Sequence, residues 1–412
     1  MTPLKTVLAL SAAALVLAAC GGPKAATTLA PQNGQAASAT AAAASSAPRA
    51  LNGLPVVAYS KASPPPAWPG PLPYPIIIAD RANGRILEVT PTKRVVWEFP
   101  PPQGLHGQQF GSDDDVFFTP KGSNIMTNEE HQGTIAEVSY YTHKIVWTYG
   151  HYGVERYGNG YLDYPDDAYR LPNGTTIVAD IRNCRELFIS PSKQIIQQWG
   201  VEQAGGNGHC PNTYLPTSIG SPNGDTPQPN GDVLLSVING NYVAMMSPKG
   251  RMLWYAHVPD LGTGYVSDAQ MLPNGDVLTA SYGKPGRVVV FNPHTGKVAW
   301  LYDVTSGPGE LNHPSLALPL PNGNILLNDD YNDRVVVIDY KTKQIVWQYG
   351  VKGISGTAPG YLNTPDGLDV DYFRNWQAWF KAYPKYGVNV ATPATNPGGP
   401  MPNPATGGPS ST

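Results

Sequence analysis

Short apolar runs that contain tryptophan recur along the middle of the chain. The runs RVVWEF, KIVWTYG, QIIQQWG, RMLWYAH, KVAWLYD and QIVWQYG hold Trp97, Trp147, Trp199, Trp254, Trp300 and Trp347. Each run is short and rich in β-branched and aromatic residues, as β-strands are. The tryptophans are 50, 52, 55, 46 and 47 residues apart. A period of this length predicts a repeated β-structure.

Two turn patterns divide each repeat into strands. Pro-Asn-Gly occurs at 172–174, 229–231, 273–275 and 321–323. Asn-Gly between two apolar runs predicts a tight hairpin. Asp-x-x-Asn-x-Arg begins at Asp80, Asp180 and Asp329, each time where one apolar run ends and the next follows. The sequence therefore predicts an all-β fold, a six-bladed β-propeller of four-stranded antiparallel blades over residues 73–373.

The first repeat lacks its innermost strand, and the last strand of the chain has no repeat of its own. Residues 73–99 supply three apolar runs, and only a Pro-rich segment precedes them. The segment NTPDGLDVDY, which begins at Asn363, matches the start of a repeat. We expect it to pair with residues 75–80 and close the ring as three strands plus one, which leaves no open blade edge.

Two motifs carry a resemblance to known repeat families. Gly-x-Leu-x-x-Pro at 160–165, 309–314 and 360–365, joined to the Asp-x-x-Asn-x-Arg turn, resembles the NHL repeat. The segment NPHTGKVAW at 292–300 is similar to the PQQ-like repeat of quinoprotein-type propellers. The resemblance implies the propeller fold, but these families include enzymes, binding proteins and scaffolds. The quinone cofactor PQQ is not expected, because the chain has no adjacent pair of cysteines and one tryptophan per blade is explained by packing between blades.

The two ends of the chain have a different composition. Lys5 precedes an apolar run that ends in Leu17-Ala18-Ala19-Cys20, which resembles the lipobox of bacterial lipoproteins. The resemblance implies a signal peptide over 1–19, lipidation of Cys20, and a protein anchored to a membrane in the extracytoplasmic cell envelope; an ordinary secretory signal is the alternative. We expect residues 20–72 to form a flexible Ala/Ser-rich and then Pro-rich tether, and residues 374–412 to be a largely disordered extension.

Charge and cysteine content narrow the function further. The net charge is −3 and only 14% of residues are charged, without a basic stripe, so nucleic acid is not expected as a partner. We also expect a monomer. Besides Cys20, the chain has Cys184 in a predicted turn and Cys210 in a connection between blades. Both lie on the same predicted face, so in an oxidising compartment we expect them to form a disulfide.

That face carries the long connections between blades, and most histidines lie there. The candidate catalytic residues are His106, His151, His209, His313 and Arg182. Histidine titrates near neutral pH and binds metals. However, no pair has close metal-ligand spacing such as His-x-x-x-His, and the alternative is that histidines simply collect in polar loops.

Small oxygen-bearing side chains recur at the predicted start of each innermost strand. The candidate ligand-binding residues are Asp114, Asp166, Thr217, Ser267, Ser315 and Asp366. They would surround the mouth of the central channel and form a polar or cation-binding ring, with calcium or zinc as the metals considered. The alternative is that each side chain fixes the backbone at the start of its own strand.

The sequence is consistent with two functions. The first is a lipid-anchored binding or scaffold protein that holds a protein, peptide or glycan on its loop-rich face. The second is a propeller enzyme: a lyase, a calcium-dependent lactonase-like hydrolase or an arylsulfotransferase-like protein, with a His/Asp site on that face. Only analogy of fold supports the second function.

Overall fold

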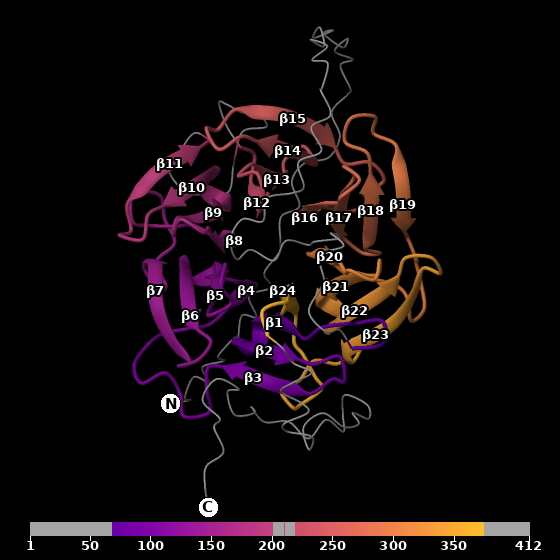
Figure 1. Cartoon of the computed structure of the whole chain (residues 1–412), viewed down its shortest axis with the longest axis horizontal. Coiled ribbons are helices and arrows are strands. Elements are labelled where there is room, and N and C mark those ends of the chain that lie inside the picture. The colour runs from indigo at the N-terminus through magenta and orange to yellow at the C-terminus, as the bar shows by residue number, and fades with distance from the viewer. Residues whose placement is uncertain (1–67, 201–209, 211–218, 375–412) are drawn as a thin grey trace, which may run out of the picture. The chain divides into compact units, whose positions relative to one another are not determined.

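The computed structural model describes residues 68–200, 210 and 219–374, which form six four-stranded antiparallel sheets. Figure 1 shows the sheets side by side around a common centre, so the predicted six-bladed propeller is confirmed. The predicted signal peptide, Cys20 and most of the two terminal extensions lie outside the described residues. Among the described residues, no helix has the length and apolar character that crossing a membrane requires.

The first three blades, each from its innermost strand outward, are β24 (Pro365–Val370), β1 (Ile76–Asp80), β2 (Arg85–Val89), β3 (Val95–Phe99); β4 (Asp113–Phe118), β5 (Asn124–Glu129), β6 (Thr134–Ser139), β7 (Lys144–Gly150); and β8 (Pro165–Arg170), β9 (Thr176–Asp180), β10 (Arg185–Ile189), β11 (Ile195–Trp199).

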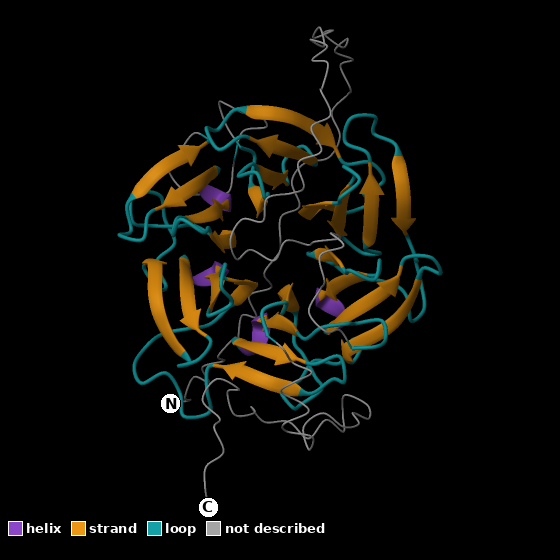
Figure 2. Ribbon diagram, viewed as in Figure 1, coloured by secondary structure: helices purple, strands orange, loops and turns teal. Residues whose placement is uncertain are grey.

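The other three are β12 (Pro222–Pro227), β13 (Val233–Val237), β14 (Tyr242–Met246), β15 (Met252–His257); β16 (Tyr265–Met271), β17 (Val277–Tyr282), β18 (Arg287–Phe291), β19 (Val298–Tyr302); and β20 (Ala317–Pro319), β21 (Ile325–Asp329), β22 (Arg334–Asp339), β23 (Gln344–Gly350). Four short 3-10 turns (purple in Figure 2) join the second and third strands of blades one, two, three and six: η1 (Arg81–Asn83), η2 (Glu130–Gln132), η3 (Ile181–Asn183) and η4 (Asp330–Asn332).

Blade one is closed by both ends of the propeller sequence. Strand β24 pairs with β1 in antiparallel register, with Val370 opposite Ile76 and Leu368 opposite Ile78. All four side chains are buried. The predicted closure by three strands plus one is therefore confirmed, and β24 becomes the innermost strand of blade one.

The repeated tryptophans join neighbouring blades. The indole N–H of Trp97 donates to the carbonyl oxygen of Tyr140 in blade two at 2.8 Å, and that of Trp300 donates to Tyr340 in blade six at 2.8 Å. Trp347 donates to Pro91 at 2.9 Å and so links the last blade to the first. Apolar clusters also fill the spaces between blades. The tryptophan column thus has a structural role.

The Asp-x-x-Asn-x-Arg turn fixes the start of each inner strand. In blade three, Asp180 accepts hydrogen bonds from the Asn183 amide and from Arg185 Nε, the latter at 2.7 Å. Its other carboxylate oxygen accepts the backbone N–H of Asp163, in the loop that leads into β8, at 2.8 Å. Asp80 and Asp329 make equivalent contacts. The turn is therefore tied to the loop that begins the inner strand, and both face the centre.

Candidate functional site

Each inner strand places a small polar side chain at the loop-rich end of the centre. We call this set the upper ring: Asp114, Asp166, Asn223, Ser267, Ser315 and Asp366. All six are buried. Hydrogen bonds link neighbours around the ring: Asn223 donates to Asp166, Ser267 to Asn223 at 2.9 Å, and Ser315 to Asp366 at 2.5 Å. Five of the six predicted ring positions therefore lie together as expected.

Blade four requires a correction. The strand register puts Asn223, and not Thr217, at the ring position, because Pro222 of β12 pairs with Val237 as Pro165 of β8 pairs with Asp180. Thr217 itself lies outside the described residues. Asn223 stands six residues before the hairpin Pro229, the same spacing as in the other blades. Blade four therefore follows the common spacing, with Asn223 at the position that the sequence predicted for Thr217.

A single arginine neutralises much of the upper ring. Arg81, the first residue of η1, forms ion pairs with Asp114 at 2.9 Å, with Asp366 at 2.8 Å and with Glu130. Its other contact is His131, whose Nε2 lies 3.2 Å from the guanidinium. Burial disfavours the charged guanidinium, but the carboxylates of Asp114 and Asp366 outweigh that cost and raise the pKa of Arg81. The ring therefore has its own built-in cation.

The turn between the second and third strands supplies this charge pattern. Its first residue is Arg81 in blade one, Glu130 in blade two and Asp330 in blade six. Asp330 accepts a hydrogen bond from the Asn328 amide at 2.6 Å and another from Ser315 at 3.3 Å. The same turn position thus directs a positive charge at the ring from blade one and an acid from blades two and six.

Aromatic and basic side chains form a rim above the ring. We call this set the rim: His131, Tyr164, Arg182, Tyr265, Tyr282, His313 and Tyr331. The Tyr164 ring lies 3.8 Å from the Arg182 guanidinium and 4.9 Å from the His131 ring. On the other side, the Tyr282 ring lies 4.8 Å from His313 and 5.3 Å from Tyr265. Tyr265 and Tyr282 lie on β16 and β17, and the other rim residues lie in 3-10 turns or in loops that precede inner strands. Figures 1 and 2 show the inner strands converging on the centre.

Two rim residues hold an uncommon backbone conformation. Tyr164 and His313 have φ values of 60° and 56°, in the left-handed region. Tyr164 directly precedes Pro165, the first residue of β8, and His313 precedes Pro314 in the loop that leads into β20. Non-glycine residues adopt this region at a cost that the surrounding structure must offset. Burial, opposed by Arg81 and reinforced by Asp114, raises the pKa of Tyr164 to about 12, so its hydroxyl is a hydrogen-bond donor at neutral pH.

A second set of acids lies one residue further along the inner strands. We call Asp115, Asp166, Asp167 and Asp268 the lower cluster; Asp166 belongs to both levels. Carboxylate oxygens of Asp115, Asp166 and Asp167 lie within 4.8 Å of one another. Burial and the neighbouring acids raise the pKa of Asp115 well above its usual range, and burial raises that of Asp268 to about 8. This level has the donor atoms that hard metal ions prefer.

The predicted catalytic residues do not all converge. Arg182 and His313 lie in the rim. His106 and His151 are exposed in loops; His151 packs on Tyr161 at 4.5 Å, and no contact within the described ranges joins either histidine to the ring. His209 lies outside the described residues. The predicted disulfide between Cys184 and Cys210 is present, with the two Cα atoms 5.5 Å apart.

Sequence reasoning missed the residues with the most contacts in the site. Arg81, Glu130 and Asp330 each directly follow the acid that begins the turn between two strands, so the repeated turn pattern locates this position in the sequence. The pattern does not indicate that its side chain faces the centre. The direction follows from the structure, in which the preceding acid, such as Asp80, binds both the turn and the loop before the inner strand.

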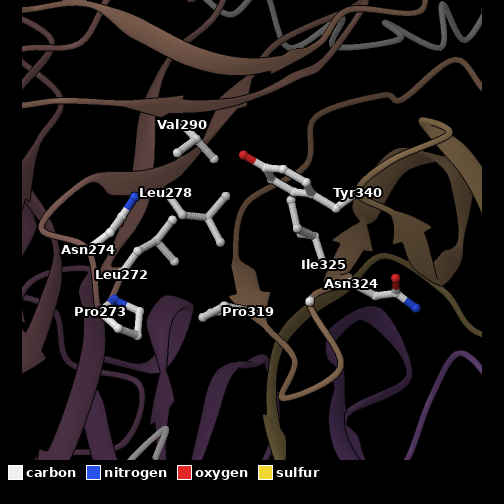
Figure 3. A pocket seen from close by; sticks show the side chains of 10 residues that line it. Leu272, Pro273, Asn274, Leu278, Val290, Pro319, Asn324, Ile325 and Tyr340 are labelled. Carbon is white, nitrogen blue, oxygen red and sulfur yellow. The ribbon is translucent and has the colours of Figure 1, made fainter. Parts of the chain in front are cut away.

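An apolar cavity of about 390 Å³ lies on the opposite, hairpin-bearing face, between blades five and six. Figure 3 shows Leu272, Leu278, Val290, Ile325 and Tyr340 around it. No charged side chain lines this cavity. It therefore offers shape and apolar surface but no catalytic group.

A family model described as outer membrane protein assembly factor BamB matches residues 214–358. This match and the six blades agree with the PQQ-like repeat propeller that the sequence predicted. No curated protein matches the chain.

Solved structures resemble the chain at the level of the fold. A protein of unknown function from Bacteroides caccae is 18% identical, with a TM-score of 0.49 over 72% of this chain and 98% of that one. Virginiamycin B lyase from Staphylococcus aureus is 11% identical, with a TM-score of 0.39 over 57% of this chain and 69% of that one. Likenesses at this level concern the fold alone.

Proposed function

We propose that this chain is a binding and scaffold module of the cell envelope that holds a protein or peptide partner on its loop-rich face. The observation that carries the proposal is the rim. Half of the Tyr331 surface and 36% of the Tyr265 surface are exposed, and the Arg182 side chain is partly exposed beside them. Tyrosine and arginine are enriched at protein interfaces and dominate their binding energy.

The charge beneath the rim favours a partner with a basic side chain. Arg81 pairs with Asp114, Asp366 and Glu130. Asp166 and Asp330 add two more acids, which accept hydrogen bonds from asparagine amides. An excess of carboxylates below a rim of tyrosines attracts lysine or arginine by charge and by cation–π contact. A glycan is the other class of ligand that such a rim could bind, through stacking on the tyrosines.

The proposed location in the cell envelope rests on the N-terminal motif and on the description of the matched family. The motif that ends at Cys20 predicts a lipid anchor, and the matched family is named for an outer membrane assembly factor. Replacement of Cys20 by serine should move the protein from the membrane fraction to the soluble extracytoplasmic fraction, as measured by cell fractionation. Retention of the Cys20→Ser protein in the membrane fraction would count against the anchor.

The enzyme alternative receives less support from the geometry. Of the four candidate histidines, only His313 has described contacts in the rim, and those are to Tyr282, Tyr331 and Asn312. A general acid–base pair requires side chains within hydrogen-bond reach of one reacting atom. His106 and His151 are exposed in separate loops. We therefore propose binding rather than catalysis.

Site-specific photo-crosslinking in intact cells tests the binding role. A crosslinking aromatic amino acid at position 331 in the rim is compared with the same residue at position 255, where Tyr255 is 47% exposed on the outer strand β15. We expect discrete protein adducts from position 331 and none of the same size from position 255. Identical adducts at both positions, or none at 331, would contradict a partner at the rim.

A further inference from the structure

We propose that the lower cluster binds one calcium ion. Its carboxylates come from the inner strands of blades two, three and five: Asp115 from β4, Asp166 and Asp167 from β8, and Asp268 from β16, with β12 of blade four between the last two strands. Oxygens of the first three lie within 4.8 Å of one another. The inference is independent of the proposed binding role.

Two oxygens of the cluster have no donor. Asp167 Oδ2 accepts the backbone N–H of Asp225 at 3.2 Å, but Asp167 Oδ1 and Asp268 Oδ1 are buried and have no hydrogen-bond partner within the described part of the chain. Buried carboxylate oxygens are normally paired, because leaving them without a partner costs free energy. A cation between the carboxyl groups would satisfy both oxygens at once.

Glycines leave the space that these carboxylates occupy. At the position equivalent to Asp167, blade four has Gly224 and blade one has Gly367. A Cβ atom on Gly224 would lie 2.1 Å from Asp268 Oδ1, and one on Gly367 would lie 2.5 Å from Asp115 Oδ1. Any side chain at these two positions would displace the cluster. Glycine at these two positions thus keeps room for the carboxyl groups of Asp115 and Asp268.

The donor set and its spacing point to calcium. All the candidate ligands are carboxylate oxygens, without a sulfur or an imidazole, and this excludes a typical zinc site. Calcium takes about six to eight oxygen ligands and is often bound by several carboxylates of one protein, whereas magnesium keeps several waters and usually binds only one or two carboxylates. Three carboxylates with oxygens within 4.8 Å of one another, and a fourth acid beside them, therefore favour calcium.

The upper ring differs from the lower cluster because an arginine of the protein neutralises its acids. The other possible metal-binding group, Asp114, Glu130 and Asp166, contains two acids that already pair with Arg81. The ion pairs of Arg81 in the described part of the chain are with Asp114, Asp366 and Glu130. Burial and the neighbouring acids raise the pKa of Asp115 and Asp167 well above the usual range. The lower cluster therefore requires protons or an added cation, and its geometry fits the cation.

Calcium titration of the chelator-stripped mature protein tests this inference, with binding followed by calorimetry and by the melting temperature. We expect about one calcium ion per chain and a rise in the melting temperature, with a much weaker response to magnesium. Asp115→Asn and Asp167→Asn should lower the calcium affinity by about tenfold or more, since even the loss of outer-shell groups has this effect. Both variants should fold without calcium, because the amide removes charge repulsion and keeps the shape.

Asp113→Asn is the matched control. Asp113 lies on the same strand as Asp115, is fully buried, and has two carboxylate oxygens without a partner, but it is not part of the cluster. It should bind calcium as the wild type does. The inference is overturned if the stripped wild type takes up no calcium at about 1 mM, the weak end of calcium sites in proteins. It is also overturned if magnesium binds in preference or if Asp113→Asn loses as much affinity as Asp115→Asn.

Discussion

The upper ring and the lower cluster are built from neighbouring residues of the same strands, yet their charges are balanced differently. Asp114 belongs to the ring and pairs with Arg81 at 2.9 Å. Asp115, the next residue, is just as buried and is surrounded by acids. The difference arises from one turn in blade one, which supplies an arginine where blades two and six supply acids. A repeated backbone can therefore place two chemically distinct sites one residue apart.

Removal of the closing strand β24 should have the largest effect on stability, and it alters both the upper ring and the lower cluster. A chain that ends before Asn363 lacks Asp366 from the ring and Gly367 beside Asp115, and exposes the edge of β1. Because β24 completes blade one, we expect loss of cooperative folding, which amounts to the whole free energy of unfolding, about 5–15 kcal/mol. Circular dichroism during thermal melting measures this. A chain that ends after Arg374 is the control, and an unchanged melting temperature in the shorter chain would refute the closure argument.

Substitution of Arg81, the cation of the upper ring, should have the next largest effect on stability. Arg81→Gln leaves Asp114, Asp366 and Glu130 without a positive partner, and loss of one partner of a buried ion pair costs about 3–5 kcal/mol. Urea unfolding measures the loss. The exposed Arg251 replaced by glutamine should change stability by less than about 0.5 kcal/mol.

A second substitution isolates the contribution of charge to that loss. Asp114→Asn added to Arg81→Gln should recover part of the stability, since it removes one of the uncompensated acids. If the double variant is less stable than Arg81→Gln alone, the ion pair is not the source of the effect.

The buried acids Glu186 and Asp225, beside the lower cluster, provide a test of pH dependence. Burial raises the pKa of Glu186 to about 8 from an ordinary value of 4.5, and it lies beside Asp225. A group whose pKa is higher in the folded state stabilises the fold fully below pH 4.5 and loses that contribution as the pH rises to about 8. Glu186→Gln should remove this decline, which urea unfolding at several pH values measures. Equal slopes of unfolding free energy against pH for both proteins would contradict the shift.

The smallest change in stability is expected at the rim. Tyr331 is half exposed, so Tyr331→Ala should alter the free energy of unfolding by about 0.5 kcal/mol or less. Its effect on partner binding should nevertheless be large if the rim is the binding surface. Crosslinking from a neighbouring rim position in the Tyr331→Ala background would show a loss of the adduct. A retained adduct would remove Tyr331 from the binding surface.

The sequence predicted the architecture well because its signals are local and repeated. Tryptophan spacing, the Asn-Gly hairpins and the unmatched strand at Asn363 together specify the blades and their closure. The site was predicted only in part. Most of the upper ring follows from its spacing to the hairpin proline, but Arg81 and Glu130 act through contacts between blades that no local pattern encodes. The aromatic rim is likewise assembled from several separate loops and strand ends.

A crystal structure from calcium-containing solution, with anomalous diffraction recorded, tests the contrast between the two levels most directly. The account predicts one anomalous peak bound by Asp115, Asp166 and Asp167, while the Arg81 guanidinium remains between Asp114 and Glu130. A peak among Asp114, Glu130 and Asp166 with Arg81 displaced, or no peak at the lower cluster, would contradict it.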